Sequence, residues 1–385
     1  MDSVEITSAL MRCPSITPLD AGALGVLERY LEKLGFSCTM LRFSGDGSEE
    51  VTNLYARLGT ESPNFCYAGH TDVVPVGDLK DWQYPPFDAV VQDGVLYGRG
   101  AVDMKGAIGA FVVAVEKYLR RLESVGTQNP GSISLLITGD EEGTGINGTR
   151  KVLKWLKERR EVLDHCLVGE PTNPNQVGDM VKIGRRGSLN AIIKLLGKQG
   201  HVAYPEKALN PVSRVGKLLK AITEHKFDEG TSRFDPSNLE VTSIDVGNMA
   251  TNVIPGAVTI RLNIRFNDEH TGNQLTSWLR EVCHEYAGNH KLSVDISGEA
   301  FVTAAGDYAE LVGESIREVT GRKPVLSTSG GTSDARFIKD VCPVVEFGLI
   351  SQTMHRTDEC VSISELESLS DVYTAILCNY FDSGL

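Results

Sequence analysis

The sequence predicts an α/β protein that carries a second, inserted α+β domain. Short apolar runs bounded by turn residues recur along the chain, and helical patterns lie between them. This alternation is typical of a sheet covered by helices. Near Val181 the pattern changes to the order β-α-β-β-α-β, which is that of a ferredoxin-like split unit. A length of 385 residues also favours more than one domain.

The first domain is defined by buried strands and two long helices. Apolar residues at intervals of three and four predict the helices. The expected strands are 64–68, 132–138, 165–168 and 344–347, and the expected helices are 104–122 and 149–159.

The inserted domain is defined by its own set of elements. Asn210 opens its first helix, with Pro211 in the first turn. The expected strands are 188–196, 240–246, 257–266 and 292–296, and the expected helices are 210–225 and 272–286. We therefore expect a first domain over 1–181 that resumes at 296–385, with the inserted domain at 182–295.

Charge and hydropathy exclude several classes of function. Lys and Arg total 38 against 51 Asp and Glu, a net charge of −13, which argues against binding to nucleic acid. An anionic ligand must therefore be met by a few well-placed cations. No apolar stretch reaches the ~20 residues that span a bilayer. The N-terminus lacks a secretion signal and the eight cysteines lie singly, so we expect a cytoplasmic protein with reduced thiols.

His70 and Asp72 form the first candidate site, after the strand 64–68. Residues two apart in an extended segment point to one side. A carboxylate beside a metal-binding histidine can accept its second N–H and fix the ring. A histidine held by a local hydrogen bond is the alternative.

Asp103 lies in a glycine-containing loop, 97–106, before the long helix. Two glycines let the loop turn tightly, and Asp103 comes just ahead of the helix. A helix cap is the alternative interpretation, because Asp is a favoured N-cap residue. The loop is not a dinucleotide-binding motif, since Asp103 replaces its third glycine.

Three acids in a row, Asp140 to Glu142, follow the strand 132–138. They repel one another unless cations or protons neutralise them. Neighbours in an extended chain project to opposite sides, so Glu141 and Glu142 could take different roles, one binding metal and the other handling protons. A solvated acidic turn is the alternative.

Glu170 and His355 complete a set of polar residues that follow expected strands. All five positions fall beyond the C-terminal ends of strands, where open α/β sheets bind ligands. Two histidines and several carboxylates suit divalent zinc or its first-row neighbours, and a carboxylate can bridge two ions.

These motifs, in this order, resemble the metal-site signature of the dizinc aminoacylase and carboxypeptidase superfamily. Three longer strings, 184–188, 200–205 and 329–337, resemble the branch that hydrolyses N-succinyl-L,L-2,6-diaminopimelate to succinate and diaminopimelate. One departure is Ser351, which stands where that branch has an asparagine. The resemblance implies a zinc-peptidase-like catalytic domain and an inserted domain for dimerisation and closure.

The resemblance also implies a role for each residue. One zinc ion is held by His70, Asp103 and Glu170. The other is held by Asp103, Glu142 and His355, and cobalt can substitute for zinc. Asp72 supports His70, and Glu141 is the general base. The expected substrate contacts are His201, which reaches the oxyanion from the second subunit of a homodimer, the cations Arg185 and Arg265, and the neutral donors Tyr204, Asn252 and Thr332.

Other functions remain open at this point. The segment 331–335 is one residue away from the nucleophile elbow of serine hydrolases, although that function leaves the acidic strand ends unexplained. His284 and Glu285 lack the second histidine of a thermolysin-like site. A related dizinc deacylase or dipeptidase would share the metal ligands, and a non-enzymatic metal- or peptide-binding protein would not need a base such as Glu141.

Overall fold

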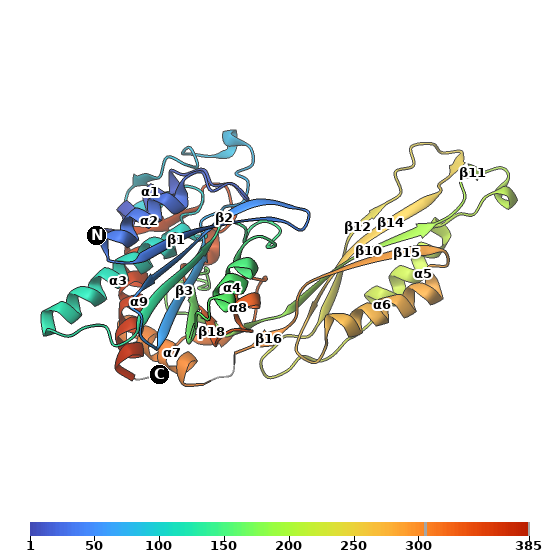
Figure 1. The fold of residues 1–385 in the computed structure, drawn as a ribbon. Coiled ribbons are helices and arrows are strands. Elements are labelled where there is room, and N and C mark those ends of the chain that lie inside the picture. Colours follow the sequence, from blue (N-terminus) through green and yellow to red (C-terminus); the bar gives the residue numbers. More distant parts are fainter. Residues whose placement is uncertain (304–305, 384–385) are drawn as a thin grey trace. The chain divides into compact units, whose positions relative to one another are not determined.

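The computed structural model describes residues 1–303 and 306–383, and the chain divides into two compact units (Figure 1). Unit 1 comprises Met1–Ile183, Thr303–Ser327 and Ser333–Leu385. Unit 2 comprises Gly184–Val302 and the short segment Thr328–Thr332.

Unit 1 is built on an eight-stranded mixed sheet with the order β1-β2-β6-β3-β7-β18-β8-β17. β3 pairs in parallel with β6 and β7, and β7 pairs in parallel with β18, whereas β2 is antiparallel to its neighbours. The fold class predicted from the sequence is confirmed. The strands are β1 (Ser37–Gly45), β2 (Ser48–Leu58), β3 (Asn64–His70), β6 (Ser132–Thr138), β7 (His165–Val168), β8 (Met180–Lys182), β17 (Val325–Ser327) and β18 (Val344–Glu346).

Helices cover both faces of this sheet, with α3 and α9 on the opposite side from α4 and α8 (Figure 1). All seven residues of β6 are buried, as a strand covered on both faces requires. Phe111 of α3 stacks on Phe65 and Tyr67 of β3, and Tyr373 of α9 meets Phe111 edge-on. The helices are α1 (Ser3–Met11), α2 (Ala23–Lys33), α3 (Lys105–Val125), α4 (Thr149–Glu158), α7 (Asp307–Thr320), α8 (Ala335–Ile338) and α9 (Ile363–Ser383).

Asp103 is positioned by a separate three-stranded sheet of β4 (Val90–Gln92), β5 (Val95–Tyr97) and β19 (Cys360–Ser362). The expectation that every candidate follows a buried strand of one sheet is therefore wrong for Asp103, which follows β5. The helix-cap interpretation is also wrong, because α3 begins at Lys105 with Met104 as its N-cap.

Unit 2 contains an antiparallel sheet of order β12-β14-β10-β15, the arrangement of a ferredoxin-like fold. Every second residue of β10 from Leu189 to Leu195 is buried, so one face of the sheet packs on a core shared with α5 and α6. The elements are β10 (Gly187–Leu196), α5 (Val212–Thr223), β12 (Asn238–Asp245), β14 (Ala257–Phe266), α6 (Gly272–Tyr286) and β15 (His290–Gly298).

Short elements complete the chain. Two-residue strands form the pairs β9 (Gly184–Arg185) with β16 (Phe301–Val302) and β11 (Gly200–His201) with β13 (Val253–Ile254), and 3-10 turns lie at Leu79–Asp81, Pro205–Lys207 and Ser351–Thr353. In the described part of the chain, no helix combines the length and apolarity needed to span a membrane.

Candidate metal centre

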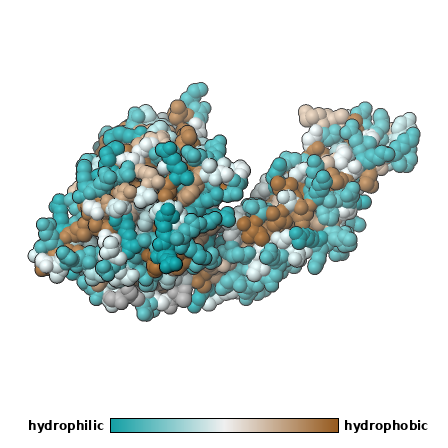
Figure 2. Space-filling view, in the orientation of Figure 1, coloured by the Kyte–Doolittle hydropathy of each residue, from teal (hydrophilic) through white to brown (hydrophobic). Residues whose placement is uncertain are grey.

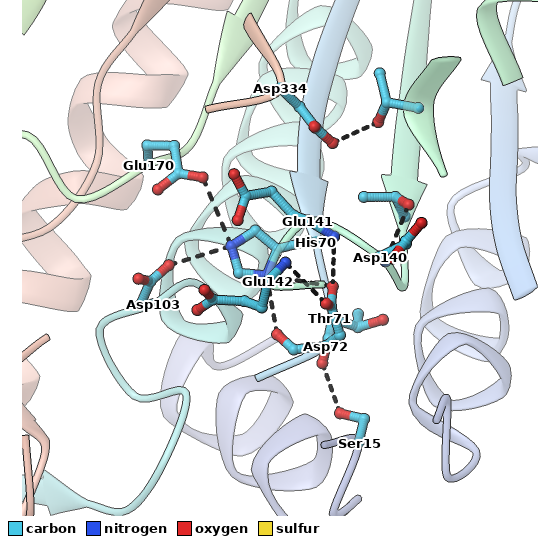
Figure 3. A network of polar contacts seen from close by, with 12 residues as sticks. Ser15, His70, Thr71, Asp72, Asp103, Asp140, Glu141, Glu142, Glu170 and Asp334 are labelled. Atoms are coloured by element: carbon cyan, nitrogen blue, oxygen red, sulfur yellow. Dashed lines mark hydrogen bonds and ion pairs between the residues drawn. The ribbon is translucent and has the colours of Figure 1, made fainter. Parts of the chain in front are cut away.

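Acidic and imidazole side chains converge at the C-terminal edge of the unit 1 sheet (Figure 3). His70 is the last residue of β3, Glu141 and Glu142 follow β6, and Glu170 follows β7. Because these strands run parallel, their C-terminal ends meet at one edge. Parallel pairing therefore brings together residues that lie about a hundred positions apart in the chain.

The first ligand group consists of His70, Asp103 and Glu170. The Nε2 atom of His70 lies 3.2 Å from Asp103 Oδ1 and 3.6 Å from Glu170 Oε1. One ligand atom from each residue lies within 4.8 Å of the others, and all three residues are buried. This spacing fits one metal ion.

The second ligand group consists of Asp103, Glu142 and His355. The Nε2 atom of His355 lies 3.0 Å from Asp103 Oδ2 and 2.8 Å from Glu142 Oε1. Asp103 therefore directs one carboxylate oxygen toward each histidine. A carboxylate shared in this way can bridge two ions.

Crowding of buried carboxylates dominates the electrostatics of this centre. Burial, reinforced by the charge of Glu170, raises the pKa of Glu141 well above its usual range. Burial and the charge of Asp103 raise the pKa of Glu170 to about 7. Burial also acts on Asp103, but hydrogen bonds from the two histidines outweigh it and hold its pKa well below the usual range. The cluster therefore favours positive charge at its centre.

Asp72 acts on the acidic loop as well as on His70. The Nδ1 atom of His70 lies 2.9 Å from the backbone oxygen of Asp72, whereas the nearest carboxylate oxygen lies 3.6 Å away. The carboxylate instead accepts the backbone N–H groups of Glu141 at 3.3 Å and Glu142 at 3.0 Å. We expected the carboxylate to hold the ring, and in the structure the backbone carbonyl makes the closer contact.

Glu141 lies beside the ligands of both groups. It forms a third group of closely spaced ligand atoms with His70 and Glu142. Asp334, which sequence analysis did not single out, adds to the negative field on Glu141. Its carboxylate accepts a hydrogen bond from Thr149 at 2.6 Å. Asp334 belongs to the string 329–337, which carries part of the resemblance, but the sequence of that string does not indicate that the Asp334 side chain lies near Glu141.

The substrate contacts expected from the resemblance lie in unit 2. His201, Tyr204 and Asn252 are exposed, and the Nδ1 atom of His201 accepts the N–H of Ala203 at 3.1 Å. Arg185 donates to the backbone oxygen of Gly331 at 2.9 Å, next to Thr332. Arg265 has a buried Nη1 atom with no hydrogen-bond partner among the described residues.

Two further observations concern the alternatives. The hydroxyl of Ser333 donates to the buried carboxylate of Glu346 at 2.8 Å and not to a histidine, which argues against a serine nucleophile. Ser351, the departure from the expected pattern, donates its backbone N–H to the oxygen of Asn173 at 2.9 Å. Ser351 therefore has a structural contact within unit 1.

Comparison with known proteins assigns the class. The model of peptidase family M20/M25/M40 matches residues 66–379, and the chain belongs to this family. An M20 family metallo-carboxypeptidase from Sulfolobus solfataricus has the same fold, with a TM-score of 0.81 at 17% identity over 99% of this chain and 100% of that one. A dinuclear metal-binding peptidase of the M20 family from Bacillus subtilis aligns with a TM-score of 0.70 at 14% identity, covering 99% and 98% of the two chains.

More similar relatives carry one shared name. A succinyl-diaminopimelate desuccinylase of Parvibaculum lavamentivorans is 54% identical over 99% of this chain and 96% of its own length. Proteins of the same name from Rhodospirillum rubrum and Caulobacter vibrioides are 52% and 53% identical, over 99% of this chain and 99% and 96% of theirs.

Proposed function

We propose that this protein hydrolyses the amide bond of N-succinyl-L,L-2,6-diaminopimelate to give succinate and L,L-2,6-diaminopimelate, a step in the synthesis of diaminopimelate and lysine. The observation that carries the hydrolytic chemistry is the pair of ligand groups that share Asp103. The substrate is supported by relatives of that name at 52–54% identity over nearly the whole chain.

The residues of the two groups fit a pair of zinc ions, for which cobalt could substitute. Each group offers imidazole nitrogen and carboxylate oxygen, a donor set that zinc accepts, and their crowded negative charge calls for cations. Bound zinc would lower the pKa of water from 15.7 toward ~7 and polarise the substrate carbonyl. His70, Asp103 and Glu170 would hold one ion, and Asp103, Glu142 and His355 the other.

Glu141 is the general base in this proposal. Its carboxylate lies beside the ligand atoms of His70 and Glu142, where it would take a proton from the attacking water and pass it to the departing amine. The Asp72 carboxylate accepts hydrogen bonds from the backbone amides of Glu141 and Glu142, and so fixes the backbone of the proposed base and of the neighbouring metal ligand. Asp72 is therefore a positioning residue.

Unit 2 supplies the substrate contacts and the dimer in this proposal. Arg185 and Arg265 would bind substrate carboxylates, and the unpartnered Nη1 of Arg265 supports this role. Tyr204, Asn252 and Thr332 would donate hydrogen bonds. His201 would stabilise the oxyanion from the second subunit. Hydrophobic and hydrophilic residues are mixed on the visible face of unit 2 (Figure 2), and Ile192 is an exposed hydrophobic residue of its sheet. The homodimer is proposed from the resemblance.

One experiment separates this function from related ones. The metal-free protein is assayed with N-succinyl-L,L-2,6-diaminopimelate, N-acetylornithine and simple dipeptides, before and after addition of zinc. We expect zinc-dependent release of succinate and little cleavage of the other substrates. Preferential cleavage of a dipeptide or of acetylornithine would contradict the proposed substrate, and activity that survives a chelator would contradict the metal chemistry.

We also propose that the reaction takes place in the cytoplasm and that its substrate is a small anionic molecule.

A further inference from the structure

A fully buried ion pair lies next to the metal ligands. The Nη1 atom of Arg99 is 2.7 Å from Glu359 Oε2, and the two residues are 2% and 0% exposed. They are separated by 260 positions in the chain and none of the functional roles above uses them. A buried pair is weak evidence for stability alone, because desolvation offsets much of the attraction.

Glu359 holds the loop that carries Asp103. Its Oε1 atom accepts the backbone N–H of Val102 at 2.8 Å and that of Asp103 at 3.0 Å. Its backbone oxygen accepts the N–H of Gly98 at 2.8 Å. One residue therefore fixes both ends of the loop from Gly98 to Asp103, and the Asp103 carboxylate leaves that loop toward both histidines.

Arg99 connects the same loop to the segment of His355. Its Nη1 atom donates to the backbone oxygen of Arg356 at 3.1 Å, and its Nη2 atom lies 3.4 Å from the oxygen of Pro75. The guanidinium lies 5.2 Å from the ring centroid of Trp82. Lysine could not reach these acceptors together, because it lacks the planar array of donors.

His355 needs such support, because its backbone lies in the left-handed region with a φ of 60°. A residue other than glycine persists in that region only when its surroundings hold it there, and such residues cluster at functional sites. The contact from Arg99 to the oxygen of Arg356 acts on the very next residue. The contact from Glu359 acts on Asp103, the partner of His355 at 3.0 Å.

We propose that Arg99 and Glu359 are positioning residues that set the distance between Asp103 and His355, and thereby preorganise the second ligand group for its metal ion. This inference rests on the proposed dinuclear centre and deepens it. The pair contacts the backbone of Asp103, a member of the second group, and the backbone of Arg356, the residue that follows His355. Among the described residues, its contact with the first group is with the shared Asp103 alone, so its loss affects the second ion more.

The test compares zinc binding by the folded, metal-free protein and its variants, measured by competition with a chromophoric chelator. Glu359→Gln keeps an oxygen for the two loop amides but loses the charge that holds Arg99, and Arg99→Lys keeps the charge but loses the contact to Arg356. Both should weaken the second ion about 10- to 100-fold, the usual effect of losing an outer partner of a metal ligand, and the first ion by a smaller factor.

A control ion pair, less buried than that of Arg99 and Glu359, lies at the other end of the sheet. Glu161 accepts from both Arg57 and Tyr55, so Glu161→Gln also breaks an ion pair within unit 1. This variant should lose thermal stability while its zinc binding stays at the wild-type level. If Glu359→Gln unfolds, Arg99→Met combined with Glu359→Gln removes both charges and leaves none unpaired in the interior.

The outcomes separate the two proposals. A wild-type protein that binds fewer than two zinc ions would contradict the dinuclear centre itself. Two ions in wild type, with the same affinities in Glu359→Gln, Arg99→Lys and the double variant, would overturn the role of the pair alone. In a His355→Ala background, which keeps only the first group intact, Glu359→Gln should change zinc affinity by a smaller factor than in wild type. An equal factor would also overturn the inference.

Discussion

Replacing Asp72 by asparagine tests how the acidic loop is positioned. Asp72 is fully buried, and each of its carboxylate oxygens accepts one backbone N–H, from Glu141 and Glu142. Asparagine keeps one acceptor and turns an N–H₂ group toward the other amide. The loss of one hydrogen bond to a charged group costs about 1.5–3 kcal/mol. If the same free energy is lost from the transition state, kcat falls about 10- to 150-fold.

Asp140 provides a matched control within the same loop. It is 2% exposed and its carboxylate also accepts two backbone N–H groups, from Thr144 at 3.1 Å and Asn147 at 3.0 Å. Asp140→Asn should therefore lose a similar free energy of unfolding in urea but keep most of its kcat. If both variants lost kcat equally, or if Asp72→Asn kept wild-type kcat, the positioning role of Asp72 would be refuted.

Three further predictions concern protons, the base and the dimer. Hydrogen bonds to Asp103 and Glu142 raise the pKa of His355 from 6.5 to about 10, so zinc must displace a proton at pH 7, and the heat of binding should depend on the buffer's ionisation enthalpy. Heats of zinc binding that do not depend on the buffer would contradict this release of a proton. Because the pKa of His355 is raised, the metal-free protein should also lose the stability that protonated His355 contributes as pH rises through about 10. Glu141→Gln should lower kcat about 10²- to 10⁴-fold with an unchanged zinc content, and a lower zinc content would make Glu141 a ligand instead. His201→Ala should lower kcat about 10²- to 10³-fold, and mixing it with Glu141→Gln should restore activity if His201 acts from the partner subunit, whereas no recovery would place it in its own subunit's site.

Short apolar runs and the helical spacing of apolar residues made the main elements predictable. The expected strands 132–138 and 165–168 and the helix 272–286 coincide with β6, β7 and α6, because turn residues bound each run on both sides. β3 extends past the expected 64–68 to His70, since Gly69 and His70 continue the pairing with β6. Strands of two or three residues, such as β5 and β19, are too short to leave a periodic pattern.

Spatial relations within the centre were harder to predict. The order of strands brings His70 and Glu170 together, so their motifs sufficed to select them. Asp72 was selected for a bond to His70, but its carboxylate turns to two backbone amides, which no side-chain pattern encodes. Arg99 and Glu359 lie 260 positions apart, and only the fold shows that they meet.

The most direct test of the central claim is a crystal structure of the zinc-loaded protein with anomalous data collected at the zinc edge. We predict two peaks in each chain, one among His70, Asp103 and Glu170 and one among Asp103, Glu142 and His355, with Asp103 touching both. A single peak, or zinc bound away from Asp103, would contradict the proposed centre.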